Sequence, residues 1–561
     1  MADYAKLEAN IESIIDSLKG ILSQQGLGNS GDEERVITTI FLYKFLNDKF
    51  IYNLKQFAEE INIDYKTILK NENDELDAFY DKYSGNIALN YEDTIEALME
   101  KASRDDFYKE FDNALKRISA NPKNENFNIE TADGTKKLLF EAVTTNVEDS
   151  TKNNFAQALF STISTQRLDF SQAFEDNFDF YSRIFEYLIK DYNVASGTYA
   201  EYFTPQAVSK IIARILVGMS DTIKACEIYD PSAGSGSLVL HLANELGKEK
   251  DISRAIVYTQ DISQKSSRFL RINLLLNGLT DSLHNAIQGD TLLRPSHYEV
   301  ENDPQSPLKT FDYIVANPPF KLDFSSTRDS IESKWASIEN KDGLKRFFAG
   351  VPKIPNKDKK KMPIYLLFIQ HILFSLKSKG KAAIVVPTGF ITAKSGIEFA
   401  IRDYIVKNKM LKGCISMPSN IFANTGTNVS VLFIDKDNKT NHALLMDASS
   451  FGKKVKEGSN QKTVLSHEEE ELIIDTFINR RELDDVSKLV SFDEISEKNN
   501  SFSVGQYFEI KMEYVDITEE EFLKQMADFE SELTSLFEES KKLDEKIIND
   551  LKNLKFNKNK D

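Results

Sequence analysis

The ten residues FDYIVANPPF, at 311–320, combine an apolar strand with a rigid polar end. The strand-forming run stops at an amide, two prolines and an aromatic ring. The side-chain carbonyl of Asn317 and the backbone carbonyl of Pro318 can accept the two hydrogens of a planar amino group, and Pro319 helps to hold these acceptors still. Phe320 offers a face on which a base can stack. The pattern predicts a site for an exocyclic NH2 group, although an Asn-Pro pair alone would indicate only a turn.

A glycine-rich turn precedes this motif in the sequence. The segment CEIYDPSAGSGSLVLHLA, from Cys226 onward, predicts a strand, a tight turn at 230–236 and a helix that begins near Ser237. Gly234 and Gly236 allow the backbone to turn and to approach a ligand where a Cβ would interfere. The spacing differs from G-x-G-x-x-G, and no lysine follows as in a P-loop, so a pyrophosphate cradle is disfavoured.

Two further strands end in carboxylates. AIVYTQDIS reaches Asp261, and NAIQGDTLL reaches Asp290. Acidic residues at the carboxyl ends of successive parallel strands suit a ligand that lies across the edge of the sheet. The ribose hydroxyls and the adenine amine of such a ligand would be the donors to these carboxylates.

The segments DPSAGSGS, TQDIS, GDTL and NPPF, in that order, resemble the cofactor and catalytic motifs of S-adenosylmethionine-dependent methyltransferases that act on adenine N6. SGTYAEYFTPQAVSKII, at 196–212, resembles the G-x-F-Y-T-P segment of one branch, the modification (M) subunits of type I restriction-modification systems. The resemblance runs almost end to end, through FLYKFLNDKF, GKAAIVVPTGF, ISMPSNIFANTGTNVSVLFI and residues 503–507.

This resemblance implies S-adenosylmethionine as the cofactor and the N6 of a flipped adenine as the methyl acceptor. It places the catalytic site at Asn317, Pro318, Pro319 and Phe320, with Tyr202 or Phe203 as a wall of the base pocket. The implied cofactor-binding residues are Glu201, Tyr202, Phe203, Thr204, Pro205, Gln206, Asp230, Ser232, Ala233, Gly234, Ser235, Gly236, Asp261, Asp290 and Leu292. Two of them depart from the family pattern. Ser232 stands where Ala or Thr is more frequent, which should matter little because all three are small. Asp261 stands where Glu is usual and is one methylene shorter, so we expect a weaker or water-mediated ribose contact.

Composition fits an ordinary globular protein. The length of 561 residues suggests two to four domains, and a hydrophobic content of 41% is ample for packed cores. Cys226 and Cys414 lie in expected strands and are interpreted as free buried thiols, and the six His residues show no metal-ligand spacing, so we expect no metal. The sequence shows no apolar run of 18 residues and no signal peptide, and we expect a cytoplasmic protein of a bacterium or archaeon with no membrane contact.

The net charge of −18 is unusual for a protein expected to act on DNA, because lysine and arginine contacts with phosphates dominate such affinity. Residues 321–362 run against this average, with 11 Lys and Arg against 6 Asp and Glu and the run KDKKK at 357–361. Two interpretations of this basic insertion stay open. It is either a solvated surface loop or a flap over the flipped strand, with Trp335, Phe347 and Phe348 as candidate stacking groups.

The expected fold is α/β, a seven-stranded doubly wound, Rossmann-like methyltransferase sheet with an N-terminal all-helical domain and a C-terminal helical or coiled-coil tail. The expected domains are 1–165, helical; 166–480, catalytic, including the insertion; and 481–561, the tail. Helical periodicity places two apolar faces in the first domain, and seven candidate strands lie between Cys226 and Ile434. Thr204 is expected to cap a helix that begins with Pro205.

The tail carries apolar residues at alternating steps of three and four between 518 and 556, which predicts a long amphipathic helix or coiled coil. The helix either folds back on its own domain or, as the family implies, packs against a specificity (S) subunit or a second M copy. About 120 residues follow the α/β domain, too few for duplicated target-recognition modules, and no P-loop or nuclease cluster is found. We therefore expect the partners to be double-stranded DNA, the S subunit, a second M subunit and a motor or nuclease (R) subunit.

Two other functions remain open at this point. A protein-glutamine methyltransferase also binds a planar amide NH2 at an NPPY-type site. The chain could instead be a non-catalytic scaffold of a DNA-defence complex with a vestigial cofactor site, although Asp230, Asp261, Asp290 and Asn317 are all present. A self-contained adenine methyltransferase is also possible if the basic insertion reads DNA unaided.

Overall fold

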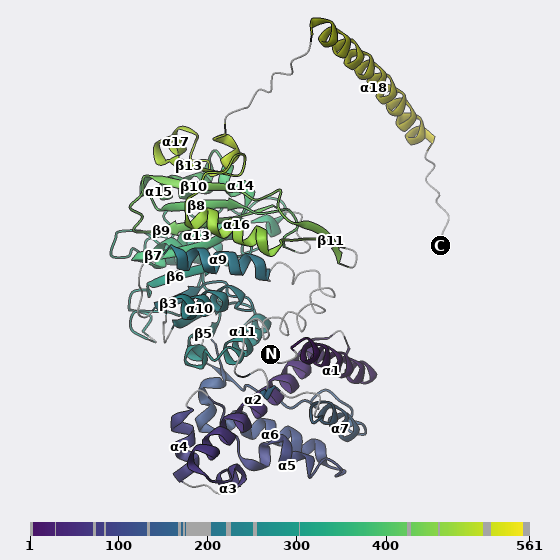
Figure 1. Ribbon diagram of the computed structural model, residues 1–561, viewed down its shortest axis with the longest axis vertical. Helices are drawn as coiled ribbons and strands as arrows, with labels where there is room; N and C mark the ends of the chain where they lie inside the picture. Colours follow the sequence, from purple (N-terminus) through teal and green to yellow (C-terminus); the bar gives the residue numbers. More distant parts are fainter. Residues whose placement is uncertain are drawn as a thin grey trace. The chain divides into compact units, whose positions relative to one another are not determined.

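A computed structural model describes residues 4–28, 30–70, 74–83, 86–131, 135–165, 170–171, 174, 204–219, 226–250, 255–301, 303–422, 428–457, 460–508 and 518–553. The chain forms two compact units, Met1–Tyr507 and Phe508–Asp561 (Figure 1). The first unit contains the expected helical and catalytic domains together with residues up to 507. We keep the borders near 165 and 480 as a proposal.

The N-terminal part is helical. Its helices are α1 (Tyr4–Gln24), α2 (Gly31–Ile61), α3 (Tyr65–Lys70), α4 (Asp74–Lys82), α5 (Ile95–Met99), α6 (Phe107–Ala120) and α7 (Lys152–Ile163). The Ser30 side chain caps α2 by accepting the N–H of Glu33, and α2 ends at Asn62 in the left-handed conformation. The two predicted apolar faces are buried, one by Ile11, Ile14, Ile15, Leu18 and Leu22 and the other by Ile37, Ile40, Phe41, Phe45 and Leu46.

A mixed sheet of eleven described strands forms the core of the catalytic part. Its strand order is β13-β10-β8-β9-β7-β6-β3-β4-β5-β1-β2. The seven predicted strands occupy its centre. They are β3 (Cys226–Asp230), β4 (Ala255–Asp261), β5 (Ala286–Gln288), β6 (Phe311–Ala316), β7 (Leu376–Pro387), β8 (Leu411–Ser416) and β9 (Val429–Asp435). The expected α/β fold is confirmed in this central part.

The sheet is wider than predicted because other segments extend both edges. On one side β1 (Ile129–Thr131) pairs in parallel with β5 and antiparallel with β2 (Lys136–Lys137). On the other side β10 (His442–Asp447) pairs in parallel with β8 and antiparallel with β13 (Ser487–Ser491). β1 and β2 are short and β13 is partly exposed, so their sequences lack the continuous apolar run of a central strand. β10 does carry a buried apolar run, at 443–446, which lies beyond the segment in which strands were predicted.

Three helices next to the sheet connect distant parts of the chain. They are α9 (Gln206–Gly218), α10 (Ser237–Lys250) and α16 (His467–Ile478), and α9 contacts both of the others. Lys210 of α9 pairs with Glu470, and Arg214 pairs with Glu471. These ion pairs join the middle of α9 to the N-terminal half of α16, and α9 follows one of the predicted site segments.

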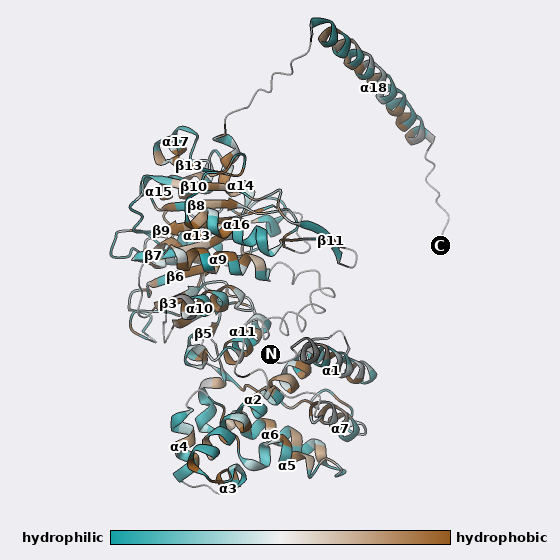
Figure 2. Cartoon of the chain, in the orientation of Figure 1, coloured by the Kyte–Doolittle hydropathy of each residue, from teal (hydrophilic) through white to brown (hydrophobic). Residues whose placement is uncertain are grey.

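The second unit contains the predicted tail helix, α18 (Glu519–Asn553). Hydropathy colouring shows apolar and polar residues alternating along it (Figure 2). The predicted seam is exposed to between 50% and 58% of its residue surface at Phe522, Met526, Phe529, Leu533, Leu536, Leu543 and Ile547. The helix prediction is therefore confirmed, and within this unit no other described element covers the seam.

Cys226 and Cys414 are free and buried, as predicted. Burial raises the pKa of the Cys226 thiol to about 12, so this thiol is unreactive. Over the part of the chain that the structure describes, no helix is long and apolar enough to cross a membrane.

Candidate active site

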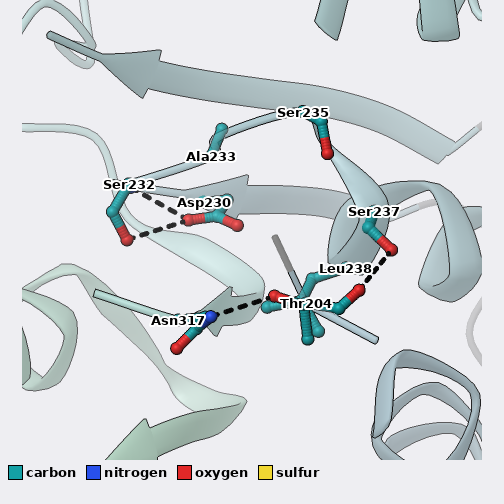
Figure 3. Close-up of a pocket in the computed structure, with 8 residues that line it drawn as sticks. All are labelled: Thr204, Asp230, Ser232, Ala233, Ser235, Ser237, Leu238 and Asn317. Carbon is teal, nitrogen blue, oxygen red and sulfur yellow. Dashed lines mark hydrogen bonds between the residues drawn. The ribbon is translucent and has the colours of Figure 1, made fainter. Parts of the chain in front are cut away.

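A pocket opens where two neighbouring parallel strands end. Asp230 is the last residue of β3, Asn317 directly follows β6, and β3 pairs in parallel with β6. Both side chains point into the same space (Figure 3). The pocket is lined by Thr204, Asp230, Ser232, Ala233, Ser235, Ser237, Leu238 and Asn317.

Asp230 is 1% exposed, although it carries a carboxyl group. Its Oδ1 accepts the N–H of Ser232 at 2.9 Å, while its Oδ2 accepts no hydrogen bond from the described residues. Burial raises the pKa of Asp230 to about 8, and the negative charge of Asp261 adds to this rise. A cationic or hydrogen-bond-donating ligand would therefore stabilise the charged form and displace a proton.

The turn after β3 requires glycine at two positions. Gly234 and Gly236 have φ angles of 54° and 85°. A Cβ on Gly236 would also lie 2.4 Å from Cδ1 of Leu270. The amide of Asn273 holds the turn by donating to the carbonyl of Ser235 at 2.8 Å.

The other two predicted carboxylates mainly shape backbone turns. Asp261, at the end of β4, is buried and accepts the N–H of Gly234 at 2.9 Å and that of Ser263 at 2.8 Å. Asp290 accepts the N–H groups of Leu292 and Leu293, at 2.9 and 3.1 Å, through Oδ1 alone. The carboxylate of Asp261 thus ties the end of β4 to the glycine turn, while Oδ2 of Asp290 accepts no hydrogen bond from the described residues.

A hydrogen bond orients the Asn317 amide. Nδ2 of Asn317 donates to Oγ1 of Thr204 at 3.2 Å, which leaves the carbonyl Oδ1 as the acceptor (Figure 3). Thr204 therefore does not cap α9 as we expected. The helix begins at Gln206 with Pro205 at the cap position, and no side chain caps it. The carbonyl of Thr204 instead accepts a hydrogen bond from the Ser237 hydroxyl at 3.4 Å.

The remaining NPPF residues continue from the strand end. Pro318 is buried, and Pro319 and Phe320 are half-buried. The ring of Phe320 lies edge-on to that of Tyr365 at 6.2 Å, so part of the Phe320 ring remains uncovered.

The structure brings together six of the predicted site residues in the pocket lining, from Thr204, the glycine turn and Asn317. Pro205, Gln206, Gly234, Gly236, Asp261, Asp290, Leu292, Pro318, Pro319 and Phe320 lie outside that lining, and Glu201, Tyr202 and Phe203 lie outside the described residues. Sequence reasoning missed Ser237 and Leu238. They belong to the first turn of α10, so the predicted helix start near Ser237 was the available signal.

The proposed stacking role of Trp335 and Phe347 is wrong for this structure. These side chains are only 4% and 2% exposed, and the Phe348 ring packs against Tyr404 at 4.5 Å. The indole of Trp335 donates to the carbonyl of Leu293 at 2.9 Å instead. Trp335 and Phe347 belong to the hydrophobic core of the protein. Burial there removes more of their apolar surface from water than stacking on a DNA base would.

The insertion also carries a buried cation, Arg346, that sequence reasoning missed. Its guanidinium donates to the carbonyls of Thr291 and Leu292 at 2.7 and 2.8 Å. It also lies 4.5 Å from the centre of the Trp335 ring. Arg346 and Trp335 together hold the loop at 291–293, which directly follows Asp290. We call this pair the loop clamp.

The KDKKK run differs from the buried aromatic residues of the insertion because all five of its residues are exposed. It includes the short helix η6 (Lys359–Lys361). The backbone N–H of Leu322 donates to the carbonyl of Met362 at 3.1 Å, which brings the two ends of the insertion together. The Ser325 hydroxyl lowers the pKa of Asp323, and the charges of Lys359 and Lys360 lower it further. The lysines therefore lie near the start of the insertion, close in sequence to NPPF.

Comparison with known proteins adds independent information. Residues 176–515 match a sequence family described as N-6 DNA Methylase. The chain is 29% identical to the type I restriction enzyme MpnII methylase subunit of Mycoplasma pneumoniae, over 91% of each protein. It is 22% identical to the type I restriction enzyme MjaVIII methylase subunit of Methanocaldococcus jannaschii, over 93% of this chain and 83% of that protein.

The fold is also found in a solved structure. The crystal structure of a type I restriction-modification system methyltransferase subunit from Streptococcus thermophilus aligns with a TM-score of 0.65. The alignment covers 89% of this chain and 99% of that chain, at 20% sequence identity. At this identity the likeness supports the fold.

The raised pKa of Asp230 predicts a stability cost that depends on pH. Because the folded-state pKa of about 8 exceeds the ordinary value near 4, the charged carboxylate destabilises the ligand-free protein as pH rises towards 8. We expect Asp230→Asn to have a higher Tm than the wild type, by a difference that grows from pH 5 to pH 8 and then levels off. Thermal unfolding across this pH range measures the difference. A difference in Tm that is negative, or that does not change with pH, would contradict the conclusion that burial of the Asp230 charge destabilises the protein.

The loop clamp predicts the effect of Trp335→Phe. This change keeps an aromatic side chain but removes the hydrogen bond to the carbonyl of Leu293, and it should lower the affinity for a ligand near Asp290. Loss of one buried hydrogen bond costs about 1 kcal/mol, so we expect a fall of about 5-fold in affinity for S-adenosylmethionine by titration calorimetry. Phe348→Leu is the control, because it changes a ring of the same insertion that packs on Tyr404. Equal affinities in both variants would show that the loop does not need the clamp.

Proposed function

The chain belongs to the N-6 DNA methylase family, and from this premise we propose that it transfers a methyl group from S-adenosylmethionine to the N6 atom of adenine in DNA. The observation that carries the proposal is the shared pocket of Asp230 and Asn317. A buried carboxylate with a free oxygen suits a cationic cofactor, and an oriented amide carbonyl suits an amino-group substrate. Adjacent strand ends place the two groups in one pocket.

The chain's residues fit the cofactor in three respects. Oδ2 of Asp230 is free to accept a donor, and Gly234 and Gly236 remove side chains from the turn at the pocket. Nε2 of Gln206, a residue outside the lining of this pocket, is buried without a hydrogen-bond partner among the described residues. We assign Asp290 to a donor of the ribose or adenine through Oδ2. When bound, S-adenosylmethionine would supply an electrophilic methyl group, whose bond to sulfur breaks as the bond to N6 forms, so that S-adenosylhomocysteine is the leaving group.

Asn317 and Pro318 prepare the acceptor. A target adenine must leave the duplex to reach the pocket, because its N6 is paired and stacked inside the helix. Oδ1 of Asn317 and the carbonyl of Pro318 then accept the two N6 hydrogens, which concentrates the nitrogen lone pair. Both oxygens are neutral and too weakly basic to take the proton, so it leaves to solvent after the C–N bond has formed. Phe320 stacks on the ring, and positioning supplies much of the rate.

Thr204 is a positioning residue in this scheme. Its hydroxyl occupies the Nδ2 side of the Asn317 amide and so presents the carbonyl to the substrate. Thr204 itself is held by Ser237, at the start of α10. The cofactor turn and the catalytic amide are thereby linked through one residue.

Sequence recognition belongs to a partner in this proposal. The net charge of −18 disfavours independent binding to DNA. The similar proteins from M. pneumoniae and M. jannaschii are named as methylase subunits of type I restriction enzymes. We propose that this chain is likewise a modification subunit, with DNA specificity from an S subunit, a second M copy in the complex, and restriction by an R subunit.

The KDKKK run supplies one DNA contact beside the base pocket. Its lysines are exposed and act electrostatically on Asp323, three residues after Phe320. The remaining contacts come from the complex as a whole.

The tail helix α18 provides a surface for subunit assembly. Its seam residues are spaced at three and four, and each is at least half exposed. The apolar seam of such a helix is removed from contact with water when it packs against another helix. We assign the S subunit or the second M copy as that partner.

Asn317→Ala tests the catalytic assignment. Loss of the acceptor should lower methyl transfer to DNA by at least about 100-fold, while affinity for S-adenosylmethionine changes less than about 3-fold. Transfer is followed with labelled cofactor and adenine N6 product is identified by mass spectrometry, using the chain alone and with its co-encoded partners. Asn408→Ala, at the exposed end of a helix, is the control. Substantial activity of Asn317→Ala would overturn the role of the amide.

The seam of α18 is tested by Leu533→Asp combined with Leu536→Asp. Two charges on the seam should prevent assembly with partner subunits, as measured by light scattering after gel filtration, without changing cofactor affinity. Lys541→Asp with Lys542→Asp introduces the same residues away from the seam and should assemble normally. Complexes of unchanged mass in the seam variant would show that α18 is not the assembly surface.

A further inference from the structure

A second basic element lies at the same edge of the sheet as the pocket. It is the antiparallel hairpin of β11 (Lys453–Glu457) and β12 (Asn460–Val464). Residues 453–464 carry four lysines and one glutamate, a net charge of +3 in a chain with a net charge of −18. From this contrast, together with its placement, we propose that the hairpin binds the phosphate backbone of the DNA that is being methylated. The inference rests on the proposed function and adds a DNA-contacting element to it.

The strand directions place the hairpin on the pocket side. β8 and β7 are each antiparallel to β9, and β7 is parallel to β6, so β8 and β6 run in the same direction. β10 is parallel to β8 and leads into the hairpin. The carboxyl end of β10 therefore lies at the same edge as Asn317, at the carboxyl end of β6.

The spacing suits a DNA duplex. β10 is four strands away from β6, about 19 Å at the usual distance between neighbouring strands. One turn of duplex DNA spans about 34 Å. DNA with its target base at Asn317 can therefore reach the hairpin with phosphates of the same helical turn.

The base of the hairpin is firmly attached to the catalytic part. The N–H of Thr463 donates to the carbonyl of Asn420 at 3.0 Å, and its hydroxyl donates to that of Ser419 at 2.6 Å. The N–H of Gly452 donates to the Glu469 carboxylate at 2.7 Å. Glu469 belongs to α16, which packs on α9. Because these hydrogen bonds hold the base of the hairpin in place, that part loses little conformational freedom when a ligand binds.

The projecting strand is polar and accessible. Lys453, Lys454 and Lys456 are all exposed, and Figure 2 shows β11 as hydrophilic. Because side chains alternate along a strand, Lys454 and Lys456 share one face with their cross-strand partners Thr463 and Gln461. The described side chains of this face include no carboxylate. Thr463 is buried at the base of the hairpin, where its hydroxyl bonds to Ser419, so Lys454, Lys456 and Gln461 are the positive or neutral groups of this face that a phosphate backbone can reach.

The test compares Lys453→Gln, Lys454→Gln and Lys456→Gln, combined in one variant, with a control of equal charge change. The control combines Lys379→Gln, Lys407→Gln and Lys439→Gln, which are exposed lysines at the opposite, amino edge of the sheet. Both are prepared as the full chain with its co-encoded partners. Binding to a fluorescent duplex of about 30 base pairs is measured against salt concentration, beside cofactor affinity and methyl transfer.

We expect the slope of log K for DNA binding against log salt concentration to be smaller in magnitude by about 2 to 3 in the hairpin variant than in the control. Near 150 mM salt the hairpin variant should bind DNA at least about 10-fold more weakly. Its cofactor affinity and its rate at saturating DNA should match the control. Equal slopes in the two variants would overturn the hairpin assignment and leave the proposed function intact. Loss of a partner subunit with an unchanged slope would assign the hairpin to a protein contact and also overturn the proposal.

Failure of the proposed function has a different signature. In that case the wild-type complex itself would bind cofactor but transfer no methyl group to DNA. That outcome would overturn both proposals. If the wild-type complex is active and the hairpin variant binds DNA like the control variant, only the second proposal is overturned.

Discussion

Parallel pairing of β3 with β4 and with β6 is the constraint on which the rest of the site depends. Parallel strands end at one edge, so Asp230, Asp261 and Asn317 follow three neighbouring strands to that edge. The carboxylates there lie among backbone N–H groups, which partly compensate for their burial. Among the described residues, Oδ2 of Asp230 has no such hydrogen bond, so this oxygen can accept one from a ligand in the pocket.

Buried arginines fix the loops that surround this edge. Arg346 holds the carbonyls after Asp290, and Arg402 donates to the carbonyls of Phe390, Ala393 and Asn500. Burial lowers the pKa of Arg346 to about 9 and that of Arg402 to about 10. Several charge-assisted hydrogen bonds to carbonyls offset this cost. A planar guanidinium binds two or three loop carbonyls at once, so a single side chain can set the course of a turn.

Charge is distributed unevenly over an acidic chain. The lysines at 357–361 and those of β11 are exposed in two separate insertions, and both insertions are attached to the carboxyl edge of the sheet. An acidic average limits unspecific binding to nucleic acid, while local basic elements retain contacts next to the reaction site. This distribution is consistent with a subunit whose affinity for DNA is completed by its partners.

The sequence by itself determined the central strands, the glycine turn, the NPPF strand end and the tail helix. These features are local, because periods of two and 3.6 residues, glycine and proline restrict the backbone within a few residues. Only the tertiary structure decided that Thr204 orients Asn317, that Trp335 and Arg346 clamp the loop after Asp290, and that β1, β10 and β13 widen the sheet. Each of these depends on contacts between residues far apart in the chain. A linear pattern does not specify such contacts, because the same aromatic or basic residue suits a buried core and an exposed ligand surface equally well.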